Sequence, residues 1–163
     1  ISAFCNAGIG LETANLFALH SHDIPVGLAT DGPMTNDRLD LLSQLKPAQV
    51  LHRMRHKSSD RFDPYTMVKM ITSDAARALH REDIGVLSPG RWADIAFVDV
   101  SDPAAQNYMR NANPFGFLVN FAQAEHVSAT MVGGKMNKEA ELEKVISELM
   151  PHLEEIARWK PKG

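Results

Sequence analysis

Two short apolar runs separated by a stretch of helical periodicity open the chain. Residues 1–5 and 24–30 are apolar and bounded by turn-forming residues, which predicts buried strands. Residues 12–22 carry apolar side chains at helical spacing. A strand, a helix and a second strand in this order predict a parallel pair joined by a right-handed crossover. Parallel strands need neighbours on both edges, so the pattern indicates part of a larger sheet.

Helical patterns dominate the next part of the chain. Residues 39–54 carry two apolar stripes, with Pro47 favouring the start of the second segment. Asp63-Pro64 is a strong helix start, because aspartate caps helices and proline suits the first helical position. Ser73-Asp74 then predicts a further short helix.

Strand patterns return after residue 82. Residues 84–90 predict a short strand that runs into a Pro-Gly turn, and residues 93–100 give the clearest strand pattern of the chain. A polar loop then leads to a helix that begins at Asn113-Pro114. Residues 126–132 alternate apolar and polar positions, and Gly133-Gly134 predicts a hairpin of type I′.

The last segment has the pattern of an amphipathic helix. Its apolar positions share one helical face, and Pro151 should bend or divide it. The changes of pattern divide the chain into three predicted parts, which are residues 1–81, 82–136 and 137–163.

Composition and charge exclude several classes of protein. A net charge of −3 gives no electrostatic footprint for nucleic acid, and no apolar stretch approaches the ~20 residues that span a bilayer. The single cysteine, Cys5, excludes an internal disulfide framework and fits a reducing compartment, so we expect a cytoplasmic protein. Because Ile1 already lies within an apolar run, we also expect a C-terminal fragment or a cleaved product.

Asp31 is the main candidate for chemistry. It directly follows the predicted strand 24–30, and barrel enzymes keep their active sites where the strands end. The alternative is that Asp31 caps the following helix or orders the loop before it. His52 and His56 have a spacing of four residues that can bind metal on a helix, but no third ligand is apparent in the sequence.

Three stretches together resemble the amidohydrolase superfamily, in its branch of cytosine-deaminase-like and chlorohydrolase-like enzymes. The resemblance covers residues 1–135. The residues that carry it are Thr30-Asp31-Gly32 with Asn36, Leu39-Asp40-Leu41 and Leu51-His52, then residues 72–99, and finally the hairpin region 126–135.

The resemblance implies an α/β fold: the C-terminal part of a TIM (β/α)8 barrel plus the C-terminal half of a small β-sandwich. Residues 1–4 and 24–30 would be the seventh and eighth barrel strands, and the segments near Ile95 and Met131 would belong to the sandwich. Cys5 stands where the family often has a small polar residue, and we expect a packed thiol there.

The resemblance also implies one divalent metal ion, usually zinc and in some members iron. In the family it is held by a His-x-His pair, two further histidines and an aspartate after the eighth strand. Asp31 matches that aspartate, which implies roles as metal ligand and as catalytic proton acceptor. The other ligands have no match here, because His20-Ser21-His22 has the right spacing but lies at a predicted helix end.

The function implied is hydrolysis of a non-peptide C–N bond in a small molecule by a metal-activated water. The full-length protein would be a homo-oligomer, and this segment alone would be inactive. The alternative is a truncated, non-catalytic homologue that serves as an interaction or assembly module through the apolar face of residues 137–159. A dihydroorotase or imidazolonepropionase branch is less favoured, because Thr30-Asp31-Gly32 followed by Asn36 resembles the deaminases.

Overall fold

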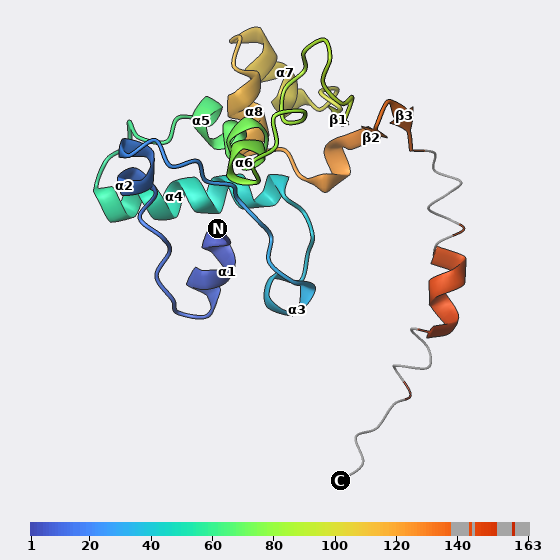
Figure 1. Cartoon of the computed structure of the whole chain (residues 1–163), viewed down its shortest axis with the longest axis horizontal. Helices are drawn as coiled ribbons and strands as arrows, with labels where there is room; N and C mark the ends of the chain where they lie inside the picture. Colours follow the sequence, from blue (N-terminus) through green and yellow to red (C-terminus); the bar gives the residue numbers. More distant parts are fainter. Residues whose placement is uncertain (138–143, 145, 153–157, 159–163) are drawn as a thin grey trace.

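Helices gathered around one long helix, with a small antiparallel sheet beside them, make up the molecule (Figure 1). The structure is a computed structural model that describes residues 1–137, 144, 146–152 and 158. In chain order the elements are α1 (Ala3–Gly8), α2 (Leu16–Ser21), α3 (Pro33–Asn36), η1 (Leu42–Gln44), α4 (Leu45–His56), α5 (Pro64–Lys69), α6 (Ser73–Ala78), β1 (Ile95–Val98), α7 (Pro103–Arg110), α8 (Pro114–Asn120), η2 (Ala124–His126), β2 (Val127–Val132) and β3 (Lys135–Met136).

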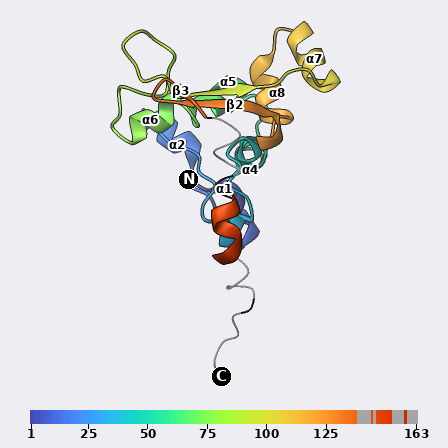
Figure 2. The ribbon, with the colours of Figure 1, turned by 90° about the vertical axis from the view of Figure 1, so that its right-hand side faces the viewer.

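The central helix α4 separates two layers of the molecule. Helix α1 lies on one side of α4, while α5 and α8 lie on the other, as both Figure 1 and Figure 2 show. The core between these layers is apolar, and each fully buried large side chain contributes roughly 1.5–3 kcal/mol. Its most deeply buried members include Leu16, Leu45, Met67 and Met70.

The predicted parallel strand pair is present at only one position. The amino group of Ile1 donates to the carbonyl of Gly27 at 2.5 Å, and the amide of Ala29 donates to the carbonyl of Ile1 at 2.8 Å. These two hydrogen bonds flank Leu28 as they do in a parallel ladder. Residues 24–30 continue without regular secondary structure, so the predicted strand there is not formed.

The prediction of a strand over residues 1–5 is wrong, because helix α1 begins at Ala3. Residues 2–8 contain two alanines and no β-branched side chain, which favours helix over strand. In the part of the chain that the structure describes, no second parallel neighbour flanks this segment, so local propensity decides its conformation.

Three predicted helix starts are confirmed and two are shifted, since α4 begins at Leu45 and not at Pro47. Asp63 caps α5 through its Oδ1, which accepts from the amides of Tyr65 and Thr66 at 3.0 and 3.2 Å. Helix α6 begins at Ser73, and Asn113 caps α8 as predicted. Helix α2 starts later than predicted, because the side chain of Asn15 caps it there.

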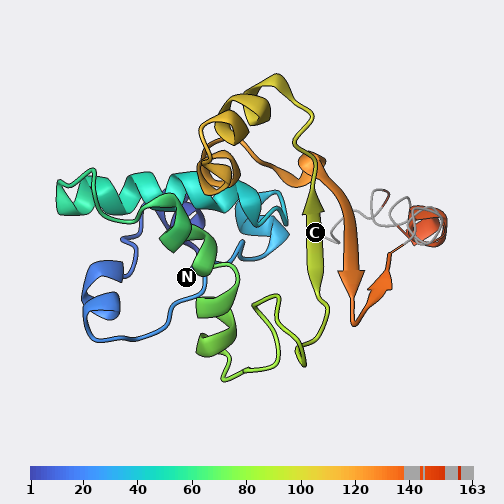
Figure 3. The same ribbon diagram turned by 90° about the horizontal axis from the view of Figure 1, so that it is seen from above.

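The sheet follows the sequence pattern closely. Strands β1 and β2 pair antiparallel, and β2 pairs with β3 across Gly133 and Gly134, whose φ angles of 56° and 79° suit a type I′ turn. Figure 3 shows β1 and β2 side by side at one edge of the helices. The predicted hairpin is therefore confirmed.

Two local predictions in the second half are wrong. Residues 84–90 form no strand, since Gly85 takes a φ of 84° and lies against α6. The polar loop before α8 instead contains helix α7, which Asp102 caps by accepting from the amide of Ala104 at 2.7 Å. Asp102-Pro103 is the same start signal as Asp63-Pro64 and could have predicted α7.

The segment predicted to be a C-terminal amphipathic helix, residues 137–163, lies largely outside the described residues. Within it, residues 146–152 are helical, and the proline at position 151 lies in that stretch. A search of the described residues finds no helix with the length and apolar character needed to cross a bilayer.

Candidate functional site

Asp31 presents an exposed carboxylate at the end of the extended segment 24–30. Its Oδ1 accepts a hydrogen bond from the amide of Gly32 at 2.7 Å. Its Oδ2 accepts from the thiol of Cys5, whose Sγ lies 3.4 Å away on α1. Each carboxylate oxygen therefore has one donor from the protein and retains a lone pair for a ligand.

The backbone around Asp31 is held in an uncommon conformation. Its φ of 65° lies in the left-handed region, which aspartate tolerates better than most residues. The side chain of Asn36, at the end of α3, donates to the carbonyl of Thr30 at 2.6 Å. Asn36 is 8% exposed, so this bond closes the loop from a buried position.

The alternative role of Asp31 as a helix cap is wrong. Gly32 occupies the N-cap position of α3, and Pro33 is its first residue. Among the described residues, the donors to the Asp31 carboxylate are the adjacent amide of Gly32 and the thiol of Cys5, and neither belongs to the first turn of α3. A loop-ordering contribution through Gly32 remains, and it leaves the carboxylate accessible.

The chemistry of Asp31 fits one ligand of a divalent metal ion. An exposed carboxylate oxygen is a hard donor of the kind that zinc and other divalent ions accept. Among the described residues, no group of three or more His, Cys, Asp and Glu side chains gathers in a way that could hold a metal. Asp31 therefore fits as a contributor to a site, not as the whole of one.

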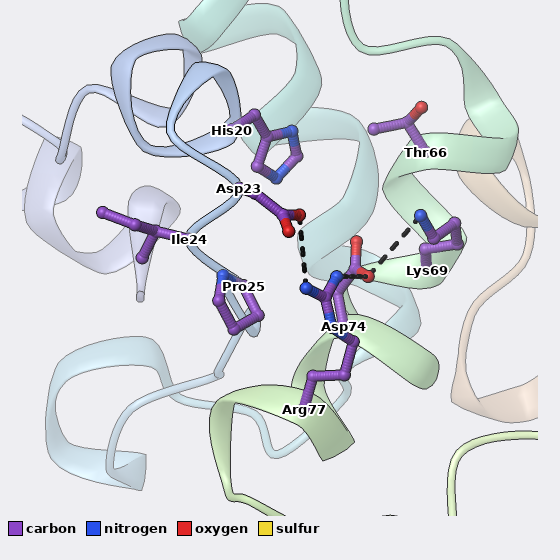
Figure 4. Close-up of a pocket in the computed structure, with 8 residues that line it drawn as sticks. All are labelled: His20, Asp23, Ile24, Pro25, Thr66, Lys69, Asp74 and Arg77. Carbon is purple, nitrogen blue, oxygen red and sulfur yellow. Dashed lines mark hydrogen bonds and ion pairs between the residues drawn. The ribbon is translucent and has the colours of Figure 1, made fainter.

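A charged pocket of about 210 Å³ lies at the opposite end of segment 24–30, beside Ile24 (Figure 4). The carboxylate of Asp74 is buried there, and its Oδ1 lies 3.5 Å from Lys69 Nζ and 3.6 Å from Arg77 Nη1. Arg77 also pairs with the exposed Asp23 at 3.2 Å. The charges balance within the pocket, so this network joins α5 and α6 to the start of the segment.

Three histidines that are separate in the sequence surround one phenylalanine. The rings of His20, His52 and His56 lie 6.0, 5.5 and 6.3 Å from the ring of Phe62, between centroids. Within the described part of the chain, neither ring nitrogen of His52 has a hydrogen-bond partner, and the side chain is fully buried. Burial, helped by the nearby charges of His56, Arg55 and His20, lowers the pKa of His52 to about 4.

Sequence reasoning found part of this histidine cluster. The spacing of His52 and His56 on one helix was visible, whereas the approach of His20 from α2 depends on tertiary packing. His22 follows the last residue of α2 and is exposed, so His20-Ser21-His22 is a helix terminus as predicted. The three rings pack around an apolar side chain and make no metal site among the residues described.

Among the described residues, the helices and the three-stranded antiparallel sheet define a mixed helix-and-strand class of protein. The family model described as "Amidohydrolase family" matches residues 3–136. The chain belongs to the amidohydrolase family, as predicted from its sequence motifs.

Known relatives agree with this assignment. The chain is 34% identical over 131 residues to a 5-methylthioadenosine/S-adenosylhomocysteine deaminase from Desulfitobacterium hafniense, covering 80% of this chain and 30% of the relative. It is similar to an adenosine deaminase from Xanthomonas campestris with bound zinc, at a TM-score of 0.80 and 22% identity, covering 94% of this chain and 36% of that one. Atrazine chlorohydrolase from Arthrobacter aurescens TC1, complexed with zinc, gives a TM-score of 0.70 and 26% identity, with 91% and 33% covered.

These similarities confirm the predicted family and its deaminase-like and triazine-hydrolase-like neighbours. The chain spans about 30% of the length of the deaminase that it matches. The zinc in the two solved structures is a property of those proteins and supports a divalent metal as the cofactor of the family.

Proposed function

We propose that this chain supplies the C-terminal part of a metal-dependent amidohydrolase that hydrolyses a non-peptide C–N bond of a small molecule. The observation that carries the proposal is the exposed Asp31 carboxylate at the end of segment 24–30, within a family match over residues 3–136. Deaminases and a chlorohydrolase among the relatives support a ring carbon bearing an amino group or another leaving group as the reacting centre.

Asp31 has two roles in this proposal. One carboxylate oxygen binds the metal ion, and the carboxylate accepts the proton released when water becomes a nucleophile. When bound, zinc (or iron) would lower the pKa of a coordinated water so that hydroxide is available near neutral pH. Because no three such ligands gather among the described residues, we expect the chain alone to bind metal weakly and to be inactive.

The finer architecture belongs to the same proposal. Residues 1–81 would be the part next to the barrel of the full-length protein, residues 82–136 would form half of a small β-sandwich around β1 and β2, and residues 137–163 would be a separate C-terminal part. We further propose that the full-length protein is a cytoplasmic homo-oligomer that acts on a small molecule. These points extend the family assignment and rest on the resemblance.

Metal content of the full-length protein tests the role of Asp31. Substitution Asp31→Ala should abolish stoichiometric zinc and lower turnover of a deaminase substrate by at least about 10²-fold, because a ligand and a proton acceptor are both lost. The measurement is elemental analysis of the dialysed protein together with ammonia release.

Asp37→Asn is the matched control for Asp31→Ala. Asp37 is also exposed and also has a left-handed φ, of 57°, but it follows α3. The Asp37→Asn variant should retain the full metal content of the unsubstituted protein. If Asp31→Ala keeps its bound metal, Asp31 is not a metal ligand and its proposed role is wrong. If even the unsubstituted protein holds no metal, the alternative of a non-catalytic interaction module is supported instead.

A further inference from the structure

We propose that Asn36 is a positioning residue that, together with Cys5, fixes the Asp31 carboxylate in the orientation that binds the metal ion. This inference rests on the proposed function, because it concerns the same carboxylate. It adds two side chains from two different elements, α3 and α1, that would act on the metal only through Asp31.

Asn36 fixes the backbone that carries Asp31. The left-handed φ of Asp31 is an uncommon conformation that persists only where the surroundings impose it. The 2.6 Å bond from Asn36 Nδ2 to the carbonyl of Thr30 ties the residue before Asp31 to the end of α3. The amides of Thr35 and Asn36 both donate to the carbonyl of Gly32, so the loop is tied at a second point. The position of the Asp31 Cα is thereby set from both sides.

Cys5 fixes the rotation of the carboxylate itself. Its thiol approaches Oδ2 while the amide of Gly32 holds Oδ1, so the two oxygens are fixed by separate donors. Cys5 is 2% exposed, and α1 packs against both α3 and α4. A thiol is a weaker donor than an amide, so Cys5 adds a contact of fixed position on Oδ2 to the stronger bond that Gly32 makes with Oδ1.

The remaining surface of Asp31 is open to a cation. The residue is exposed, and the donors of Gly32 and Cys5 use one lone pair of each oxygen. Partners that orient metal ligands in this way commonly change metal affinity by 10–100-fold when they are removed. The geometry therefore assigns Asn36 and Cys5 an effect on metal affinity beyond their effect on folding.

The first test removes the Asn36 amide in the full-length protein. Asn36→Leu keeps the side-chain volume and loses the bond to Thr30, so zinc affinity, measured by competition with a chelator, should fall by about 10–100-fold. Gln49→Met is the matched control. Gln49 is 2% exposed and donates from Nε2 to the carbonyl of Phe62 at 2.7 Å, which is another buried amide-to-backbone bond. Its loss should leave zinc affinity within about threefold of the unsubstituted protein.

The second test separates the Cys5 thiol from its packing. Cys5→Ala removes the donor and should weaken zinc binding about tenfold, whereas Cys5→Ser keeps a donor and should restore binding to within about threefold. The visible and near-ultraviolet spectrum of the cobalt-substituted protein is the second readout. Ligand-field bands should shift in Asn36→Leu and stay unchanged in Gln49→Met.

Each contrary outcome has a defined meaning. Zinc affinity that is unchanged in Asn36→Leu, or equally reduced in Gln49→Met, overturns the positioning role of Asn36. A sulfur-to-cobalt charge-transfer band that disappears in Cys5→Ser would show that the thiol binds the metal itself, which overturns its role as a donor to Asp31. If Asn36→Leu does not fold, Asn36→Ala is measured in its place against the same control.

The failure of this inference is distinguishable from the failure of the proposed function. Metal lost in Asp31→Ala but retained at full affinity in Asn36→Leu and Cys5→Ala leaves the proposed function intact and removes only the positioning roles. Metal retained in Asp31→Ala overturns both the proposed role of Asp31 and the positioning roles of Asn36 and Cys5, because the carboxylate would then bind no metal ion.

Discussion

His52 shows at the scale of one residue how burial changes chemistry. Its ring is fully buried beside Phe62, and neither ring nitrogen has a hydrogen-bond partner among the residues that the structure describes. A charged imidazole in this position would be neither solvated nor paired, so the neutral form is favoured. The sequence shows His52 and His56 at helical spacing, but burial depends on Phe62 and His20, which come from other parts of the chain.

We predict that His52 makes stability fall in mild acid. The folded pKa of about 4 lies below the ordinary value of 6.5, so the unfolded state binds the proton first. The contribution of neutral His52 to the free energy of unfolding is present above pH 6.5 and is lost as the pH falls toward 4. The free energy of unfolding should therefore drop by about 2 kcal/mol between pH 7.5 and pH 5 through this residue.

Urea denaturation at both pH values checks the prediction for His52. The variant His52→Leu should lack this loss, while His152→Gln, at an exposed histidine, should keep it. An equal pH dependence in the unsubstituted protein and in His52→Leu would contradict the argument. The charges that lower the pKa of His52 come from His56, Arg55 and His20, and all three residues remain in both variants.

At the scale of elements, capping residues predicted the helix starts more accurately than apolar runs predicted the strands. Asp63 and Asn113 mark helix starts through bonds that lie within a few residues, so the sequence alone contains both partners. The strands predicted at 1–5 and 24–30 depend on neighbours in a sheet, which local sequence does not specify. Strand β2 was predictable because its partner β3 follows after a two-residue turn, whereas β1 lies before α7 and α8 in the chain and was predicted from its own apolar pattern.

The loop at Gly85 gives a prediction at this scale. A Cβ there would lie 2.8 Å from the Cβ of Ala76 and 2.9 Å from the carbonyl oxygen of Thr72, and φ is 84°. Gly85→Ala should lower the free energy of unfolding by the cost of a left-handed alanine, about 1 kcal/mol, plus about 1–3 kcal/mol for the clash.

Comparison with Gly90→Ala separates the cost of the clash at Gly85 from the cost of a left-handed alanine. Gly90 has nearly the same φ, 83°, but a Cβ there would meet nothing within 4 Å. It should therefore show only the conformational cost, and chemical denaturation of the two variants gives the difference. Equal destabilisation would mean that α6 moves away from the loop at no cost.

At the scale of the whole molecule, one carboxylate joins the helical part to the sheet. Asp40 is 7% exposed, and its Oδ1 accepts from the amide of Ser43 at 3.2 Å while its Oδ2 accepts from the amide of Ala124 at 3.0 Å. Ala124 opens η2, which leads directly into β2. A second hydrogen bond between distant parts of the chain joins the side chains of Lys46 on α4 and Asn120 on α8. The sequence placed Asp40 in a family motif but gave no sign of its distant partner.

We predict that Asp40→Asn lowers stability by about 1–3 kcal/mol, because an amide offers one acceptor oxygen where the carboxylate offers two. Hydrogen exchange at the Ala124 amide should accelerate, and the midpoint of urea unfolding should fall. Asp94→Asn is the control, since Asp94 Oδ1 accepts from the amide of Gly133 at 2.7 Å within the sheet region, and asparagine keeps that acceptor. Similar losses in both variants would argue against Asp40 as a joint between the two parts.

Segment 24–30 has a further consequence for how such a protein can evolve. One of its ends is held by the ion pairs of Asp23, Arg77 and Asp74, and the other end displays Asp31. Substitutions among the ion pairs can adapt the protein to temperature or salt, while the opposite end is left alone. Under the proposed role of Asp31, mutations that change stability and mutations that change reactivity would therefore fall on separate residues of one short stretch of chain.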